Sequence, residues 1–225
     1  MTRRERAVLV ADELSRIYPD ARCLLDFGGV PHRLLLSTIL SAQTTDDSVN
    51  RVTPLLWRAF PRLEDLASAQ PGKVERIIHP LGFFRNKARS IIGAASWLVS
   101  RTGGRVPDTM EELLEIPGVG RKTANVVLGT IYGKPALIVD THVRRLSLRM
   151  GFTVSEDPDR IEKDLEKLVP PERRTAFSHQ MGFHGRRVCT ARSPKCGSCT
   201  ISSICPKKGL GQERPQPGAG RTPSK

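Results

Sequence analysis

Residues 109–133 read TMEELLEIPGVGRKTANVVLGTIYG, and the interpretation of the remaining chain starts from this stretch. Apolar residues repeat at helical spacing on both sides of an Ile-Pro-Gly-Val-Gly turn, which predicts two short helices joined by a glycine hairpin. Gly118 and Gly120 have no side chains, so a large partner can approach the backbone amides there. The free N–H groups and positive dipole end of the second helix favour a phosphate. The stretch therefore indicates either a site that binds a nucleic-acid backbone or an ordinary helical hairpin.

The whole chain is strongly basic. Its 225 residues include 36 Lys and Arg against 23 Asp and Glu, which gives a formal net charge of +13. Such a surplus indicates a polyanion partner, most often nucleic acid, unless this is a basic protein without one. No apolar run is long enough to cross a membrane, and the first residues read as an amphipathic helix. We therefore expect a cytoplasmic protein with no targeting segment and no membrane partner.

Helical periodicity dominates the chain, and no alternating pattern typical of a strand exceeds a few residues, so we predict an all-α fold. The stretch HRLLLSTILSAQ, residues 32–43, is apolar nearly all round and is expected to be buried. Residues 74–91 repeat the hairpin pattern 36 positions earlier, which indicates a second, weaker hairpin or a chance agreement. The tail, residues 209–225, is rich in Pro, Gly and charge and is predicted to be disordered and basic.

Four of the five cysteines crowd into one short segment with the spacing C-x6-C-x2-C-x5-C, at Cys189, Cys196, Cys199 and Cys205. Such a segment cannot bury much apolar surface, so four thiolates on one metal centre can supply the missing folding energy. A single C-x2-C with longer arms favours an iron–sulfur cubane, with a structural zinc as the alternative. Arg192 and Lys195 lie on this loop and are expected either to contact phosphates or to be solvated. Cys23 stands alone and is expected in a core.

These features together resemble the endonuclease III family of DNA-repair glycosylases, within the helix-hairpin-helix/GPD superfamily. The resemblance rests on IPGVGRKTANVVL, VDTH, LLSTILSAQTTD and the cysteine spacing, and it covers nearly the whole chain. It implies a two-domain fold with DNA in the groove between the domains. One domain is a six-helix barrel at 24–134, with the hairpin at about 109–133. The other is formed by 1–23 plus 135–208 and carries a [4Fe–4S] cluster in a C-terminal loop.

The resemblance also implies a bifunctional DNA glycosylase/AP lyase of base excision repair. Such an enzyme removes oxidised pyrimidines from double-stranded DNA and cleaves the abasic strand by β-elimination, and we expect it as a monomer at the nucleoid. By family position, Lys122 is the nucleophile that forms a Schiff base with the sugar, and Asp140 is the carboxylate that stabilises the sugar cation. The amine must be neutral to attack, and Arg121, the helix N-terminus and partial burial are expected to favour that form. From the residues alone, Lys122 fits a phosphate-binding lysine and Asp140 a plain N-cap.

Further residues resemble the DNA-binding positions of the family. Chemistry on a stacked base requires flipping it out, and Gln43 and Phe83 occupy positions like those of the family's inserting residues. The family more usually has leucine where Phe83 stands, so a helix-end glutamine and a core phenylalanine are the alternatives. His142 and Arg144 are expected at phosphates or at the orphan base, with a structural histidine as the alternative for His142. The hairpin contributes Gly118, Gly120 and Arg121 to the same surface.

Two other functions fit part of the pattern. A mismatch adenine glycosylase of the same superfamily shares the cluster and the aspartate, but it lacks the lysine and usually carries a further C-terminal domain, for which this tail is too short. A non-enzymatic DNA-binding module stabilised by zinc would share the hairpin and the cysteines alone.

Overall fold

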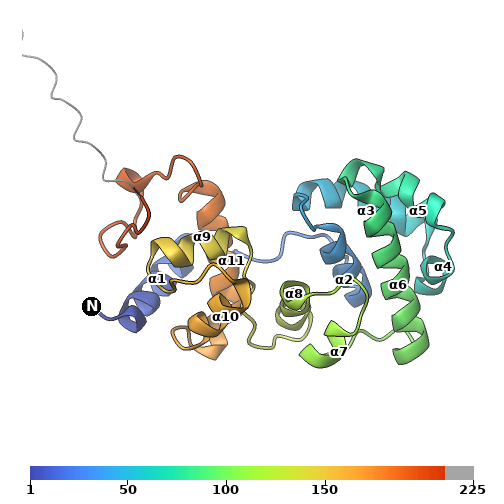
Figure 1. Cartoon of the computed structure of the whole chain (residues 1–225), viewed down its shortest axis with the longest axis horizontal. Helices are drawn as coiled ribbons and strands as arrows, with labels where there is room; N and C mark the ends of the chain where they lie inside the picture. Colours follow the sequence, from blue (N-terminus) through green and yellow to red (C-terminus); the bar gives the residue numbers. More distant parts are fainter. Residues whose placement is uncertain (211–225) are drawn as a thin grey trace, which may run out of the picture.

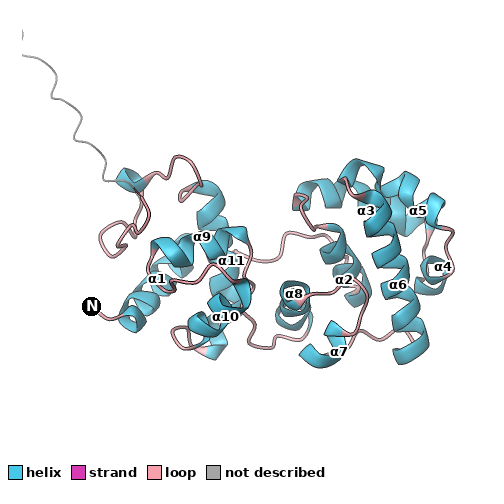
Figure 2. Cartoon of the chain, in the orientation of Figure 1, coloured by secondary structure: helices cyan, strands magenta, loops and turns pink. Residues whose placement is uncertain are grey.

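The computed structural model describes residues 1–210, and the secondary structure of this part of the chain is entirely helical (Figure 2). The predicted all-α class is confirmed. The predicted disordered tail, from residue 211 onward, lies outside the described residues. No helix of the described part has the length and apolar character needed to span a bilayer. The longer helices are α1 (Arg3–Ile17), α2 (Pro31–Leu40), α3 (Asp46–Ala59), α5 (Pro71–Ile78), α6 (Phe84–Thr102), α8 (Arg121–Ile131), α9 (Thr141–Arg149), α10 (Pro158–Glu166) and α11 (Arg174–Arg187).

Shorter helices connect these elements: α4 (Leu63–Ala67), α7 (Met110–Leu114), and the single turns η1 (His79–Leu81), η2 (Pro171–Arg173) and η3 (Cys196–Ser198). Figure 1 shows the helices in two groups. The N-terminal helix α1 lies with α9, α10 and α11, whereas α2 to α6 form the other group.

Each group has its own hydrophobic core. The first core gathers apolar residues between Leu25 and Ile138, and the second joins α1 to residues between Leu137 and Ile201. The two cores meet in an extended segment whose residues alternate between them. Ala136 and Ile138 belong to the first core, whereas Leu137 and Val139 belong to the second. The domain boundaries given above stay a prediction, and this shared segment ties the two halves together.

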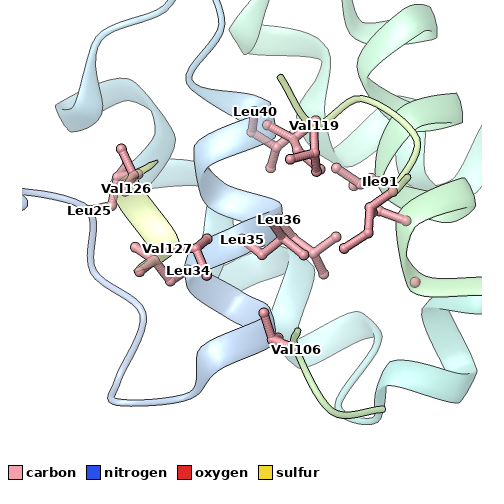
Figure 3. Close-up of a cluster of buried hydrophobic side chains, with 14 of the residues drawn as sticks. Leu25, Leu34, Leu35, Leu36, Leu40, Ile91, Val106, Val119, Val126 and Val127 are labelled. Atoms are coloured by element: carbon pink, nitrogen blue, oxygen red, sulfur yellow. The ribbon is translucent and has the colours of Figure 1, made fainter. Parts of the chain in front are cut away.

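The α2 helix is the centre of the first core (Figure 3). Pro31 opens it at the first helical position, where a missing N–H costs nothing. Every residue from Leu34 to Leu40 is buried, as its all-round apolar pattern predicts, and the hydroxyl of Thr38 donates to the carbonyl of Leu34. The helix ends at Ser41, so the polar residues that follow it emerge at the surface from a rigid support.

The helix-hairpin-helix formed by α7 and α8 is confirmed. Thr109 caps α7 by accepting a hydrogen bond from the N–H of Glu112 at 3.3 Å. Gly118 has φ +81°, and a Cβ there would lie 2.8 Å from Cβ of Ser90 on α6. Gly120 has φ −107° and would meet nothing within 4 Å. The fold therefore requires glycine at position 118 but not at position 120.

Hydrogen bonds and an ion pair connect the hairpin to the second half of the molecule. Arg121 donates from Nη2 to Oε1 of Glu162 at 2.7 Å and from Nε to Oε2 at 3.2 Å. The side chain of Glu162 is only 7% exposed, so this two-pronged contact neutralises a buried carboxylate. Asn125 donates to the carbonyl of Leu137 at 2.9 Å. Helix α8 is therefore fixed against both cores.

We predict that Gly118→Ala lowers the free energy of unfolding by about 2–4 kcal/mol, because the left-handed backbone and the contact with Ser90 are both unfavourable to a Cβ. The matched change Gly120→Ala should lower it by less than about 1 kcal/mol, because alanine is a poorer N-cap than glycine but meets no neighbouring atom there. Urea denaturation of both variants measures the difference. Equal losses of stability in the two variants would contradict this account of the turn.

Candidate functional site

A cleft with about 1600 Å³ of open space lies between the two halves. Lys122 from the start of α8 and Asp140 from the start of α9 both line it. The loop between α2 and α3 contributes Gln43, and α11 contributes Arg186. The structure therefore brings the two predicted catalytic residues to one cavity, where the ends of several helices meet.

Lys122 is the second residue of α8 and is exposed to solvent. Gly120 is the N-cap of this helix and has no side chain to accept a hydrogen bond. The backbone N–H groups of the first turn, next to the Lys122 amine in sequence, are therefore free. The predicted partial burial of Lys122 is wrong. The guanidinium of the neighbouring Arg121 is paired with Glu162, so its charge is compensated within the protein.

Asp140 is the N-cap of α9. Its Oδ1 accepts hydrogen bonds from the N–H groups of His142 at 2.9 Å and Val143 at 2.8 Å. Within residues 1–210, Oδ2 of Asp140 has no hydrogen-bond partner. One oxygen therefore fixes the carboxylate at the helix terminus, while the other is left for a ligand in the cleft, so capping and a second role are compatible.

Two histidines near Asp140 are neutral at pH 7. Burial and, to a smaller extent, the charge of Arg186 lower the pKa of His179 to about 4. Burial also lowers the pKa of His142, whose Nδ1 lies 3.2 Å from Nη2 of Arg145. The electrostatics of the cleft are therefore set by Lys122, the carboxylates and the arginines, and not by imidazolium groups.

An ion pair between Arg186 and Asp46 joins the two sides of the cleft, with Nη2 and Oδ2 3.5 Å apart. Arg186 comes from the last turns of α11, and Asp46 is the first residue of α3. The sequence analysis identified neither of them as a functional residue. Thr45 caps α3 instead, by accepting from the N–H of Ser48 at 3.3 Å. No local pattern marks this pair, because its partners are distant in sequence.

Gln43 and Phe83 lie at two exposed loop tips with left-handed backbone, at φ 53° and φ 46°. Such a conformation costs a non-glycine residue about 1–3 kcal/mol and is concentrated at functional sites. Both residues line a second cavity of about 620 Å³, together with Ser90 and Gly118. Phe83 is 66% exposed, so its interpretation as a core phenylalanine is wrong. Gln43 lies beyond Ser41, which caps the end of α2, and it lines both cavities.

The other predicted contact residues are spread around the cleft. His142 and Arg144 line it, and Arg144 is within 3.7 Å of Glu156. Arg192 and Lys195 are exposed on the cysteine loop and do not line this cleft. Arg121 lies in the ion pair with Glu162, so its guanidinium is already engaged.

The four clustered cysteines surround one cavity with about 370 Å³ of free space, beside Met150 and Ile201 of the second core. Within residues 1–210, no three His, Cys, Asp or Glu side chains are placed to hold a single metal ion. Burial raises the pKa of the Cys199 and Cys205 thiols. Four sulfur donors around one small cavity fit a multi-iron cluster, because each iron of a cubane takes one thiolate.

Two of these cysteine sulfur atoms lie close to a side-chain nitrogen. Nη1 of Arg149 lies 3.3 Å from Sγ of Cys189, and Nε2 of His184 lies 3.5 Å from Sγ of Cys199. A guanidinium beside a thiolate stabilises its negative charge, so the arrangement suits an anionic sulfur ligand set. Apart from the single turn η3, the loop from 189 to 205 has no helix of its own.

Two protein families match the chain. Residues 36–171 match the family described as HhH-GPD superfamily base excision DNA repair protein. Residues 189–205 match the iron-sulfur binding domain of endonuclease III. Endonuclease III of Synechocystis sp. is 48% identical over 206 residues, which cover 91% of this chain and 94% of that protein. Endonuclease III of Bacillus subtilis is 39% identical, covering 92% of this chain and 93% of that protein.

Solved structures of endonuclease III also resemble the fold of this chain. A trapped endonuclease III–DNA covalent intermediate superposes with a TM-score of 0.87 at 39% identity, covering 92% of this chain and 97% of that chain. A non-covalent endonuclease III–DNA complex gives the same TM-score and identity, and covers 96% of that chain. A thermostable thymine-DNA glycosylase has a TM-score of 0.79 at 23% identity, which supports the fold alone.

We predict that Cys199→Ser destabilises the second half of the molecule, because the loop loses one of the four sulfur donors that we expect to bind the cluster in place of a hydrophobic core. The melting temperature should fall by at least about 5 °C, since 1 kcal/mol corresponds to about 2–4 °C at this size. Iron content and visible absorbance should fall with it. Cys23→Ser is the matched control, because that thiol packs on the first core and lies outside the cysteine cavity. An unchanged melting curve for Cys199→Ser would rule out a structural role for the cluster.

Proposed function

The chain belongs to the endonuclease III family, and we propose that the cleft between its two halves is the active site, with Lys122 and Asp140 as its catalytic residues. The protein is a bifunctional DNA glycosylase and AP lyase of base excision repair. It acts on DNA and holds an iron–sulfur cluster, which is a [4Fe–4S] cluster in this family. The observation that carries the residue assignment is that a single cleft contains both side chains.

The neutral amine of Lys122 attacks C1′ of the damaged nucleotide, and the bond between C1′ and the base breaks. The departing base takes the electron pair of that bond and is protonated. The sugar ring then opens as the amine loses a proton, and a Schiff base forms between Nζ and C1′. Loss of a proton from C2′ expels the 3′ phosphate by β-elimination, and water releases the aldehyde from the enzyme.

Asp140 supports this sequence in two ways. Its free oxygen places negative charge where the sugar becomes cationic as the base leaves. The same carboxylate relays protons between the amine and the departing groups. The two N–H groups that hold Oδ1 keep the side chain oriented throughout, so the helix terminus provides a preorganised site.

The substrates that we propose are oxidised pyrimidines in duplex DNA, and the flipped nucleotide occupies the cleft. Gln43 and Phe83 enter the gap that it leaves, which is supported by their exposure and by the strained backbone that holds both loop tips outward. An aromatic ring can stack on the remaining bases, so phenylalanine serves at a position where leucine is more usual in the family.

The DNA backbone is held on both sides of the cleft. The free N–H groups at the start of α8 bind a phosphate that approaches over Gly118 and Gly120. Because the guanidinium of Arg121 is paired with Glu162, this residue contributes through its backbone N–H. His142 and Arg144 contact the strand from the rim of the cleft. Arg192 and Lys195, exposed on the cysteine loop, contact phosphates farther along the duplex.

The rival functions have less support. A zinc-stabilised, non-enzymatic module is wrong, because residues 189–205 match an iron–sulfur domain and the relatives are enzymes. A monofunctional adenine glycosylase would not need an amine in the cleft, where Lys122 lies. We propose that the protein works as a monomer at the nucleoid, in the cytoplasm, where its DNA substrate is.

We predict that Lys122→Gln abolishes borohydride trapping of a covalent complex with DNA and slows strand nicking by at least about 1000-fold, because no amine remains to form the Schiff base. Gel assays of trapping and nicking measure both effects. Lys73→Gln, a change at an exposed lysine of α5 that does not line the cleft, should leave both unchanged. Normal trapping by Lys122→Gln would remove Lys122 from the mechanism.

A second prediction concerns Asp140→Asn. Asparagine caps a helix as well as aspartate does, so the melting temperature should stay the same while base release slows by about 10²–10⁴-fold. Asp140→Ala should additionally lose about 1 kcal/mol of stability with the cap. Single-turnover release of base from a duplex with one lesion separates the two effects. Undiminished base release by Asp140→Asn would show that the negative charge is not used.

A further inference from the structure

Lys87 is a buried lysine, only 5% exposed, near the start of α6. Its Nζ donates hydrogen bonds to Oγ1 of Thr44 at 2.6 Å and to the carbonyl oxygen of Leu81 at 2.9 Å. The hydroxyl of Thr44 itself donates to the same carbonyl at 2.8 Å. These three groups form a closed set of hydrogen bonds that joins segments about 40 residues apart.

The stability of the fold does not by itself explain why a lysine occupies this buried position. No carboxylate of residues 1–210 lies within ion-pair distance of it, and burial lowers its pKa. Burying a charged group without a countercharge is unfavourable, and an apolar side chain of similar length often serves stability equally well. The amine is therefore better explained by what it holds in place.

The two segments that Lys87 joins carry the two strained loop tips. Thr44 directly follows Gln43, and Leu81 comes two residues before Phe83. Gln43 and Phe83 both have left-handed backbone and line the same cavity, and Lys87 lines that cavity as well. The hydrogen bonds of the Lys87 ammonium group, together with the one from Thr44 to Leu81, therefore fix the spacing between the tips of the two loops.

We propose that Lys87 is a positioning residue for base extrusion, and that its hydrogen bonds to Thr44 and Leu81 hold the Gln43 and Phe83 loops at the separation needed to fill one gap in the duplex. The proposal rests on the insertion of Gln43 and Phe83 described above. Lys87 itself touches neither the sugar nor the departing base. Its effect is on geometry, and a displacement of about 1 Å can cost about 10²-fold in rate.

The test compares Lys87→Met with the wild-type enzyme on two DNA substrates. The first is a duplex with one oxidised pyrimidine and 2-aminopurine as the opposing base, whose fluorescence reports unstacking. The second is an abasic site in single-stranded DNA, where no base pair has to be opened. Lys87→Met should slow the fluorescence change and base release by about tenfold or more, and should alter Schiff-base trapping on the single strand by less than about threefold.

Variants at Thr44 test the same contact from its other end. Thr44→Val removes the hydroxyl that accepts from Lys87 and donates to Leu81, so it breaks two of the three hydrogen bonds and should reproduce the slow extrusion, whereas Thr44→Ser keeps the hydroxyl and should retain the wild-type rate. Thermal melting is measured for all three variants. Because Lys87→Met removes an unpaired buried charge, its melting temperature should equal or exceed that of the wild type.

The outcomes separate this proposal from the function it rests on. Wild-type rates of extrusion in Lys87→Met, with slow extrusion in Gln43→Ala and Phe83→Ala, would overturn the positioning role and keep the insertion. Equal losses on both substrates, accompanied by a lower melting temperature, would reduce Lys87 to a stabilising residue and overturn the proposal. Normal extrusion in both Gln43→Ala and Phe83→Ala would refute the insertion itself, and the role of Lys87 with it.

Discussion

The proposed active site depends on the four residues that lie between the two hydrophobic cores, residues 136–139. Ala136 and Ile138 pack into one core and Leu137 and Val139 into the other, so the segment cannot slide without exposing apolar side chains on both sides. The carbonyl of Leu137 is also held by Asn125 of α8. Asp140 follows directly, and it lines the same cleft as Lys122 from the start of α8. Hydrophobic alternation in a short extended segment brings the acid and the amine to one cleft.

Around these two groups, the charges of the cleft come from arginines and carboxylates and not from histidines. The partly buried His142 and His179 both have a lowered pKa, and the N–H groups at the start of α9 hold one oxygen of Asp140. Arg186 and Asp46 pair across the cleft, so the charge of neither is left uncompensated before DNA arrives. The amine of Lys122 and one oxygen of Asp140 are among the groups of the cleft that remain available to a nucleotide. The cysteine loop, far from these atoms in sequence, provides exposed cations and a rigid support for the second half.

Features encoded within a few residues could be predicted from the sequence. Local geometry decides the glycine hairpin, the capping role of Asp140 and the cysteine spacing. The second hairpin that the repeat predicted is formed by α5, η1 and α6, around Phe83. Features that depend on tertiary contacts could not. The guanidinium of Arg121 meets Glu162 some forty residues later, and Lys87 meets Thr44 across a similar separation. The exposure of Lys122 and the left-handed backbone of Phe83 likewise follow from how whole helices pack, which periodicity does not reveal.

The most direct test of the central claim is to identify the atom that bonds to DNA. Wild-type enzyme is reduced with borohydride on a duplex that carries one lesion, digested with a protease, and analysed by tandem mass spectrometry. The account predicts a single sugar adduct, on the ε-amine of Lys122. An adduct on another lysine or on the N-terminal amine would contradict it, because the cleft would then not be the place where the covalent chemistry occurs.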